Sequence, residues 1–569
     1  MIYHFFKPLY PLLSMVKPGI GGIIYSSNRF IIVAGILICL LNSLNSFAAD
    51  ITSTQTGNWN VGTTWIGGVA PVAGDNATIA NGDTVTVTAD ATINLLTIDN
   101  GGVLTVNATK SLTANGDLTI NGGLILKSDA TGTATLIDNG TISGSGTVTA
   151  QRYLSGAVYH YVSAPISSAN TSLFSGAHRF YLWDEPISSN DTVASWQTPA
   201  GNMDTMKGYA VEFLGNTVIN YTGVATELNT GPYNITVTNT DGIMLPNKEG
   251  WNLVGNPYPS AVDWDDAGWT ITNVDNAIYF FKGSDFNYAS YVGGAGINGG
   301  TQYIPAMQGF FVKCNNVGGS GTLEITNSVR VINSQAYWKE NKTEQNNILK
   351  LKAEGNGYSD ETVVRFDASS TNEFDSDYDA YKLLSSNENV PQIYTKLSNG
   401  TILSINTLAP LTENLSMPLI FRAGVTGEYT LNVADINFDP SISVLLEDTQ
   451  EDVIMDLQTT PDYTFNISTG TFANRFIIHF SLTTGVNDYS EDNNLSPYIY
   501  SEQNNIYVVF NTSKSIKGKI TVYDILGREI IKKDIDKLNK LSINNVKGLY
   551  IVKVLTDNNV YTKKIIINK

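Results

Sequence analysis

The residue types that carry most enzyme chemistry are scarce in this 569-residue chain. Its four histidines are His4, His160, His178 and His479, and none belongs to a His-Glu-x-x-His zinc motif. The sequence also lacks a Gly-x-Ser-x-Gly nucleophile elbow and a phosphate-binding loop that ends in Gly-Lys-Ser or Gly-Lys-Thr. It therefore predicts no catalytic residue, and we do not expect an enzyme.

A cluster of aromatic rings and carboxylates could contact a sugar. Its members are Tyr258, Asp263, Trp264, Asp265 and Trp269. Flat rings stack on the apolar faces of sugars, and carboxylates accept hydrogen bonds from hydroxyl groups, so one interpretation is a glycan-binding site. Two alternatives stay open: an acid and base pair for glycoside hydrolysis, and an acidic loop whose neighbouring rings belong to the core.

Three aspartates spaced two residues apart, Asp375, Asp377 and Asp379, could bind a hard cation. In an extended strand this spacing places all three on one face, where Ca²⁺ would relieve their mutual repulsion. The segment lacks the glycine and the distal glutamate of an EF-hand loop. The alternative to a calcium site is a solvated turn whose charge Lys382 or Arg365 neutralises. No other cofactor is expected.

Composition limits the fold class and the partners. The formal net charge is −18, which disfavours contact with the phosphate backbone, so no nucleic-acid partner is expected. Only 15% of residues are charged, while the chain contains 50 glycines and 29 tyrosines. This profile suits β-structure with many turns better than helical bundles.

The N-terminal segment is typical of a secretory signal with an upstream extension. Arg29 precedes an apolar run over residues 30–41, and Ser46-Phe47-Ala48 supplies a small-residue site after which cleavage is expected. The run is shorter than the roughly 20 residues that cross a bilayer, so we expect no transmembrane span after cleavage. Cleavage removes Cys39 and leaves Cys314 as a buried thiol that cannot form an intramolecular disulfide.

Three blocks near the C-terminus, residues 520–528, 546–554 and 563–567, resemble the type A sorting domain of the type IX secretion system. The residues that carry the resemblance are Tyr523, Asp524, Leu526, Gly527, Arg528, Gly548, Tyr550, Lys563 and Lys564. The resemblance implies a small Ig-like domain and export across two membranes by the type IX machinery, which is the expected partner. It also implies a location on the outer cell surface or in the medium of a Gram-negative bacterium.

A diverged repeat occupies the middle of the chain. The matched segments are 159–165 with 251–257, 180–183 with 278–281, and 206–213 with 307–314. In each copy, apolar strands are followed by a glycine and an aromatic strand. We therefore predict two related β-rich halves of one module.

Hydrophobic patterning predicts an all-β chain of several domains. Short apolar runs between Asn-Gly and Gly-Gly turns predict a small N-terminal parallel β-solenoid, and longer alternating runs predict β-sandwich-like modules after it. An acidic stretch without an apolar period predicts a flexible linker. The expected boundaries are 1–48 for the signal peptide with its extension, 50–152 for the solenoid, 153–335 for the duplicated module, 346–482 for a β-sandwich, 484–497 for the linker and 498–569 for the sorting domain.

Together these features favour a secreted or cell-surface protein with an adhesive or structural role. The alternative is a polysaccharide-binding accessory protein in extracellular glycan degradation, whose partner would be a surface polysaccharide or another extracellular glycan. An adhesin would promote attachment without changing its target, whereas an accessory protein would bind a glycan saturably.

Overall fold

The computed structural model describes residues 48–188, 195–241, 249–332, 347–482, 497–502, 505–510, 516–535, 539–543, 547–557 and 559–567. Nearly all of the expected signal peptide and linker lie outside these residues. From Asp50 onward the chain forms one compact unit. Among the described residues, no helix has both the length and the apolar character needed to cross a membrane.

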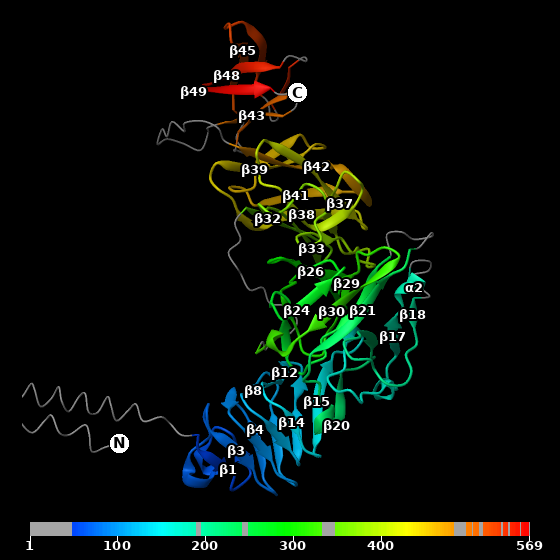
Figure 1. Cartoon of the computed structure of the whole chain (residues 1–569). Helices are drawn as coiled ribbons and strands as arrows, with labels where there is room; N and C mark the ends of the chain where they lie inside the picture. Colours follow the sequence, from blue (N-terminus) through cyan, green and yellow to red (C-terminus); the bar gives the residue numbers. More distant parts are fainter. Residues whose placement is uncertain are drawn as a thin grey trace, which may run out of the picture. The chain divides into compact units, whose positions relative to one another are not determined.

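Strands make up almost all of the regular structure, which confirms the all-β fold class (Figure 1). The exceptions in the described part of the chain are the short helix α2 (Glu185–Ser188) and several 3₁₀ turns. A chain rich in β-branched and aromatic residues, with frequent glycine turns, favours this outcome.

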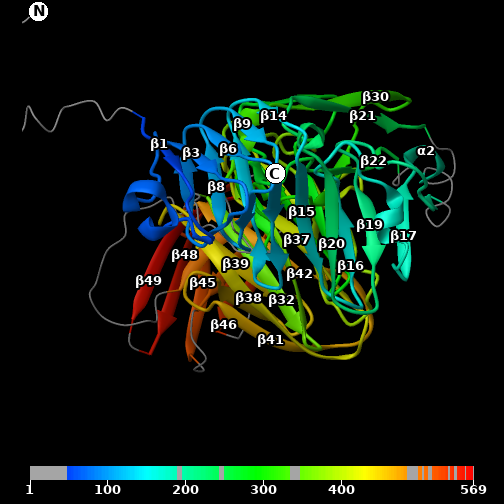
Figure 2. The same ribbon diagram turned by 90° about the horizontal axis from the view of Figure 1, so that it is seen from below.

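The first hundred described residues form a parallel β-solenoid with three sheets, as the short apolar runs predict. The first sheet contains β1 (Asp50–Thr52), β3 (Asn76–Ile79), β6 (Leu96–Ile98), β9 (Leu118–Ile120) and β14 (Ile142–Ser143), which lie side by side in Figure 2. The second contains β2 (Gly57–Asn58), β4 (Thr84–Val87), β7 (Val103–Val106), β10 (Gly123–Leu126) and β15 (Thr147–Leu154), and the third contains β5 (Ala91–Ile93), β8 (Ser111–Ala114) and β13 (Thr135–Asp138). A hairpin of β11 (Ser128–Asp129) and β12 (Gly132–Thr133) interrupts the last coil.

Equivalent apolar residues stack from coil to coil and form the solenoid core. The parallel register places Ile79 opposite Ile98, and Ile98 opposite Ile120, and all three side chains are fully buried. Because each coil buries its apolar face only against its neighbours, the coils stabilise one another. The antiparallel strand β20 (Thr217–Val224) pairs with β15 and covers that edge of the second sheet.

The two copies of the repeat form two sheets with the same strand order. In the first half the order is β16 (Tyr159–Val162), β19 (Tyr209–Glu212), β17 (Arg179–Trp183) and β18 (Trp196–Gln197). In the second half it is β22 (Trp251–Gly255), β29 (Gly309–Lys313), β25 (Ile278–Lys282), β26 (Asn287–Val292) and β27 (Ala295–Ile297). Two smaller sheets complete this region: β21 (Tyr233–Asn239), β30 (Gly319–Ile325) and β24 (Trp269–Thr272), and β28 (Tyr303–Ile304), β23 (Ala261–Asp263) and β31 (Arg330–Val331).

The two halves exchange equivalent contacts, as subunits of a symmetric dimer do. Ser163 N–H donates to the Met307 carbonyl at 3.0 Å, and Gly255 N–H donates to the Met206 carbonyl at 2.7 Å. The repeat aligns Ser163 with Gly255 and Met206 with Met307, so one half repeats the contact of the other in reverse. Both methionines have positive φ, 61° and 56°, which is uncommon for a residue with a side chain.

Glycine is required beside this contact because the backbones approach closely. A Cβ atom on Gly208 would lie 2.5 Å from the Val254 carbonyl oxygen, and one on Gly309 would lie 2.9 Å from the Cβ of Tyr161. Gly208 and Gly309 are equivalent positions in the repeat. The glycine that precedes each aromatic strand therefore permits the two halves to pack together.

A β-sandwich and a small C-terminal domain follow. The sandwich strands are, in order, β40 (Val453–Asp456), β39 (Ile442–Asp448), β42 (Gly470–Leu482), β37 (Leu415–Ala423), β35 (Gln392–Lys396), β36 (Ile402–Leu408), β33 (Tyr358–Phe366), β32 (Ile348–Gly355), β38 (Gly427–Asn437) and β41 (Asp462–Ile467), with β34 (Ala380–Tyr381) beside β36. Phe421, Phe476 and Leu431 from the two ends of this order share one core. The C-terminal strands form two sheets: β43 (Tyr498–Glu502), β44 (Asn505–Val509) and β47 (Asn539–Ser542), and β46 (Glu529–Asp534), β45 (Gly518–Asp524), β48 (Gly548–Thr556) and β49 (Val560–Ile567).

A buried ion pair joins the solenoid to the duplicated module. Arg330 Nη2 lies 2.7 Å from Asp138 Oδ1 and also donates to the Leu136 carbonyl at 2.7 Å. The guanidinium lies 5.0 Å from the centre of the Tyr258 ring. The side chains of Arg330 and Asp138 are 1% and 0% exposed, so this junction is desolvated and depends on the pairing.

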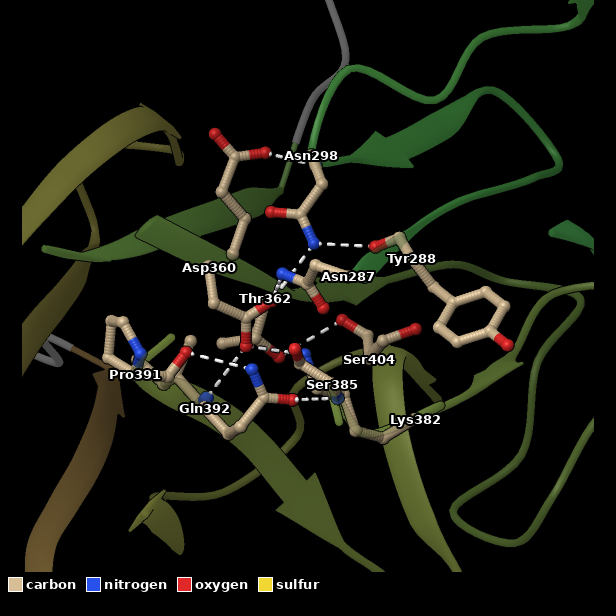
Figure 3. Close-up of polar contacts among 12 residues, drawn as sticks. Asn287, Tyr288, Asn298, Asp360, Thr362, Lys382, Ser385, Pro391, Gln392 and Ser404 are labelled. Atoms are coloured by element: carbon tan, nitrogen blue, oxygen red, sulfur yellow. Dashed lines mark hydrogen bonds and ion pairs between the residues drawn. The ribbon is translucent and has the colours of Figure 1, made fainter. Parts of the chain in front are cut away.

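A second buried network joins the duplicated module to the sandwich (Figure 3). The carboxylate of Asp360 accepts hydrogen bonds from the side-chain amides of Asn287 and Asn298, at 3.1 and 2.9 Å, and from the Ile393 N–H at 2.8 Å. Lys382 donates to the same carboxylate and forms an ion pair with it. Because Asp360 is fully buried, these donors replace the water that an ionised carboxylate requires.

Candidate functional site

The rings that the sequence offered for glycan contact belong largely to the core. Tyr258 is 0% exposed and Trp264 is 2% exposed, and both pack in the hydrophobic core of the second half. Tyr258 also donates its hydroxyl to the Gly231 carbonyl at 2.6 Å, and Trp264 donates its indole N–H to the Asn276 carbonyl at 2.8 Å. Neither ring offers a face to a sugar, so the expectation of a glycan contact at Tyr258 and Trp264 is wrong.

The remaining members of that cluster hold a loop together. Trp269 is half-buried, lies 4.7 Å from Trp264 between ring centres, and donates its indole N–H to the Asp263 carbonyl. Asp263 accepts hydrogen bonds from Gln302 and from the Asp265 N–H, while the Asp265 carboxylate accepts the Tyr291 hydroxyl. Burial raises the pKa of Asp265. This arrangement matches the alternative interpretation of the cluster, which is an acidic loop beside rings of the core.

The three aspartates proposed for calcium do not converge. Residues 376–378 form a turn, so the alternation of an extended strand, on which the expectation rested, does not apply. Asp375 accepts the Thr371 N–H, Asp379 accepts the N–H groups of Asp375 and Thr407, and Asp377 is exposed. Within the described residues, no three His, Cys, Asp or Glu side chains are placed to hold a metal ion. The structure therefore does not gather these three aspartates into a metal-binding cluster.

Of the histidine and cysteine side chains that the structure describes, His178 is exposed, His160 accepts or donates local hydrogen bonds, and His479 and Cys314 are buried. His479 lies between Ser416 Oγ, at 2.6 Å, and Glu447 Oε2, at 2.9 Å, which is the residue set of a hydrolytic triad. His479 is 1% exposed, however, so a substrate has no path to the imidazole. Cys314 is a buried free thiol, as expected, and burial raises its pKa.

An aromatic pocket that the sequence did not reveal opens on the first half of the module. It has a volume of about 390 Å³ and is lined by Tyr159, Tyr161, Tyr181, Trp196, Ala210, Phe281, Phe286 and Tyr288. Tyr161 stacks on Phe281 with ring centres 5.4 Å apart, and Trp196 lies 6.1 Å from Tyr161. The volume and the aromatic lining are those of a pocket for a small organic group.

The rim of this pocket has one charged side chain and one residue with an unfavourable backbone conformation. None of the lining residues is charged. Outside the lining, the Arg179 guanidinium lies 5.8 Å from the centre of the Tyr159 ring, donates to the Tyr159 hydroxyl at 3.0 Å, and is half exposed. Phe286 is 39% exposed and has a φ of 53°. This backbone conformation is unfavourable for a bulky residue, and such conformations often occur at ligand contacts.

The sorting-motif residues come together in one sheet of the C-terminal domain. The register of β45, β48 and β49 pairs Asp524 with Tyr550, Ile551 with Lys564, and Val552 with Lys563. At the end of β45 the Asp524 carboxylate accepts the N–H groups of Leu526 and Arg528, both at 2.9 Å, and the Arg528 Nε. These hydrogen bonds, the backbone one from Arg528 foremost, lower the pKa of Asp524.

The turn held by Asp524 presents apolar side chains to solvent. Gly527 has a φ of 76°, which allows the tight return of the chain. Ile525 and Leu526 are 66% and 74% exposed. Neither side chain contributes to the core, so both are available for contact with another protein.

Comparison with known proteins identifies two regions. Residues 51–480 match the family described as "Domain of unknown function (DUF8693)", and residues 502–568 match the secretion system C-terminal sorting domain. The β body and the tail with three motif blocks therefore define a cargo protein of the type IX secretion system, secreted or displayed on the surface of a Gram-negative bacterium. The chain belongs to the DUF8693 family.

Two curated proteins are similar to parts of this chain. The minor fimbrium subunit Mfa5 of Porphyromonas gingivalis is 23% identical over 582 residues, which cover 91% of this chain and 46% of that protein. The autotransporter CRAC of Citrobacter rodentium is 36% identical over 118 residues, which cover 19% of this chain and 7% of that protein. The chain thus spans less than half of the length of either relative.

Proposed function

We propose that this protein is a structural adhesin of the bacterial surface. The observation that carries the proposal is the similarity to a minor fimbrium subunit over 91% of the chain, in a protein that ends in a sorting domain. An all-β body with buried ion pairs at two junctions between its parts, Arg330 with Asp138 and Lys382 with Asp360, suits a mechanical role. We further propose that these parts follow the boundaries expected from the sequence.

The proposal is tested by complementing a deletion strain with the full chain or with a chain truncated after Asp488. The full chain should reach the surface or the medium and restore attachment of cells to a substratum or to other cells. The truncated chain should remain in the periplasm and fail to restore attachment. Attachment that does not differ between the deletion strain and the complemented strain would refute the adhesive role, and normal export of the truncated chain would refute the role of the tail.

A polysaccharide-binding accessory role is the second candidate, and the aromatic pocket favours it over the rings first expected to bind glycan. This role predicts saturable binding of a neutral oligosaccharide, and substitutions in the pocket should abolish that binding. An enzyme would instead release product from that oligosaccharide, which high-resolution chromatography of the mixture would detect.

A further inference from the structure

The pocket lies on a face whose counterpart in the second half is already occupied. The repeat aligns Tyr159, Tyr161, Tyr181 and Ala210 of the first half with Trp251, Leu253, Tyr279 and Phe311 of the second. The four residues of the second half are 1–7% exposed, and they share a hydrophobic core with Ile348, Val363, Ala380 and Ile405 of the sandwich. In the second half, therefore, this face is a docking surface for a β-domain.

One sandwich residue, Tyr381 on β34, makes the central contact on the occupied face. Its ring lies 6.0 Å from the Trp251 ring with the planes at 74°, and its N–H donates to the Tyr279 hydroxyl at 2.9 Å. Lys313 Nζ lies 5.4 Å from the centre of the Trp251 ring and 5.3 Å from the centre of the Tyr381 ring. The Tyr381 ring thus packs edge-on against Trp251, stacks on Phe374 of the sandwich with ring centres 4.6 Å apart, and lies beside one cation.

The first half keeps two aromatic positions of this face in the open pocket, while Tyr161 and Ala210 are buried in the core that the second half shares. Tyr159 and Tyr181, the counterparts of Trp251 and Tyr279, both line the pocket. The repeat gives Lys313 the counterpart Glu212, and the cation near the Tyr159 ring is Arg179 of another strand, which also lies 3.7 Å from the Glu212 carboxylate. Ala210 stands where the second half has Phe311, so one ring is missing from the wall of the pocket.

We infer that the pocket receives an aromatic side chain, tyrosine or phenylalanine, from a β-strand or loop of a protein partner. The side chain would pack against Tyr159, near Arg179, as the Tyr381 ring packs against Trp251 near Lys313 in the second half. The choice of a protein rests on the proposed function, in which the chain joins a surface assembly.

The lining fits an aromatic side chain better than a sugar. A sugar ring brings several hydroxyl groups that lose water on entry and need hydrogen-bond partners. The side-chain groups that the lining offers are few: the hydroxyls of the tyrosines and the Trp196 indole, and the Tyr159 hydroxyl already accepts from Arg179. A phenol or phenyl ring brings one polar atom or none, and the surrounding rings can pack on both its faces.

Binding of a short peptide to the full chain tests the inference. The probe is the acetylated and amidated peptide Asp-Ala-Tyr-Lys-Leu, the sequence of residues 379–383, and its matched control carries alanine in place of the tyrosine. Isothermal titration should detect saturable binding of the tyrosine peptide and at least tenfold weaker binding of the alanine peptide. Maltohexaose and cellohexaose, titrated in the same way, should not bind in the pocket.

Variants locate the binding. Ala210→Phe should fill the pocket as Phe311 does in the second half and weaken binding at least tenfold, and Phe286→Gly should weaken it while relieving an unfavourable φ. Leu214→Ala is the control, because Leu214 is 73% exposed and does not line the pocket. If Ala210→Phe unfolds, Arg179→Gln at the half-exposed rim replaces it, with the same loss expected.

The inference is overturned if the tyrosine peptide does not bind the parent chain, if these variants bind it normally, or if an oligosaccharide binds in its place. These measurements use purified protein, so they are independent of export and of cell attachment. A failed attachment assay with normal peptide binding would count against the proposed adhesive function alone.

Discussion

Replacing Arg330 by methionine should destabilise the junction between the solenoid and the duplicated module. The change keeps an unbranched apolar stem beside Tyr258 but leaves the Asp138 carboxylate without its cation. Both side chains are at most 1% exposed, so solvent screening does not weaken the pair appreciably. Removing one partner of a buried pair costs about 3–5 kcal/mol.

The loss of folding stability in Arg330→Met should depend on pH, because burial changes the pKa of Asp138. Burial raises the pKa of Asp138, and the charge of Arg330 opposes that rise. A carboxyl group whose pKa is higher in the folded state stabilises that state at low pH, and the contribution disappears as pH rises through the folded-state pKa. Without Arg330 this pKa rises further, so the destabilisation of Arg330→Met should be smallest near pH 4 and grow toward pH 7.

Urea unfolding at pH 4 and pH 7, followed by tryptophan fluorescence, measures this effect. Amide exchange at Leu136, whose N–H donates to the Pro259 carbonyl at 3.1 Å across the junction, reports it locally. The double variant Asp138→Leu with Arg330→Met removes both charges and should recover much of the loss. A loss below about 1 kcal/mol at pH 7, or one that does not change with pH, would refute the reasoning.

Four further predictions follow from burial and exposure. Trp264→Ala should lower the free energy of unfolding by about 3–5 kcal/mol in urea, because the ring is 2% exposed, and a loss below about 1 kcal/mol would contradict its place in the core. Asp379→Asn should flatten the fall in melting temperature between pH 4 and pH 7. Burial raises the pKa of Asp379 to about 7, so the folded state loses the stability that the protonated carboxyl contributes as pH rises. Parallel curves for the variant and the parent would argue against this reasoning. A reductant should leave the melting temperature unchanged, because Cys314 is a buried free thiol, and a shift of several degrees would reveal an intermolecular disulfide. Ile525→Asp combined with Leu526→Asp should reduce export, measured as protein in the medium and on the surface. The melting temperature of the purified chain should stay the same, because both side chains are exposed. Normal export would mean that this turn is not recognised.

The fold could be predicted from the sequence where local pattern and turn chemistry agree. Strands of three or four residues such as Leu96–Ile98 and Leu118–Ile120, closed by glycine turns, fit the coils of a solenoid and little else. The repeat was visible because strand-forming residues and the glycines at 208 and 309 recur in the same order. The sorting tail was visible because its motif residues occur in three blocks of fixed order.

The sites could not be predicted in the same way, because burial and convergence depend on the tertiary fold. Tyr258 and Trp264 are residue types that can stack on sugars, but Arg330 covers Tyr258 and both rings pack in the core of the second half. Asp375 to Asp379 has the spacing of a one-faced strand but forms a turn. The pocket could not be predicted because its rings come from residues 159–210 and 281–288, which come together only when the two halves pack.

The repeat contains one signal from which the pocket could have been predicted. Where the second copy has Phe311 the first has Ala210, so a large ring is absent from an otherwise aromatic wall. The order of the chain explains why the sandwich covers the face of the second half and not that of the first. The sandwich follows the second half directly in the sequence, so Tyr381 reaches that half within the same chain at little entropic cost. The first half is followed by the second half, whose Phe281, Phe286 and Tyr288 line the pocket beside its own rings, and the proposed occupant of the remaining space is a side chain of another molecule.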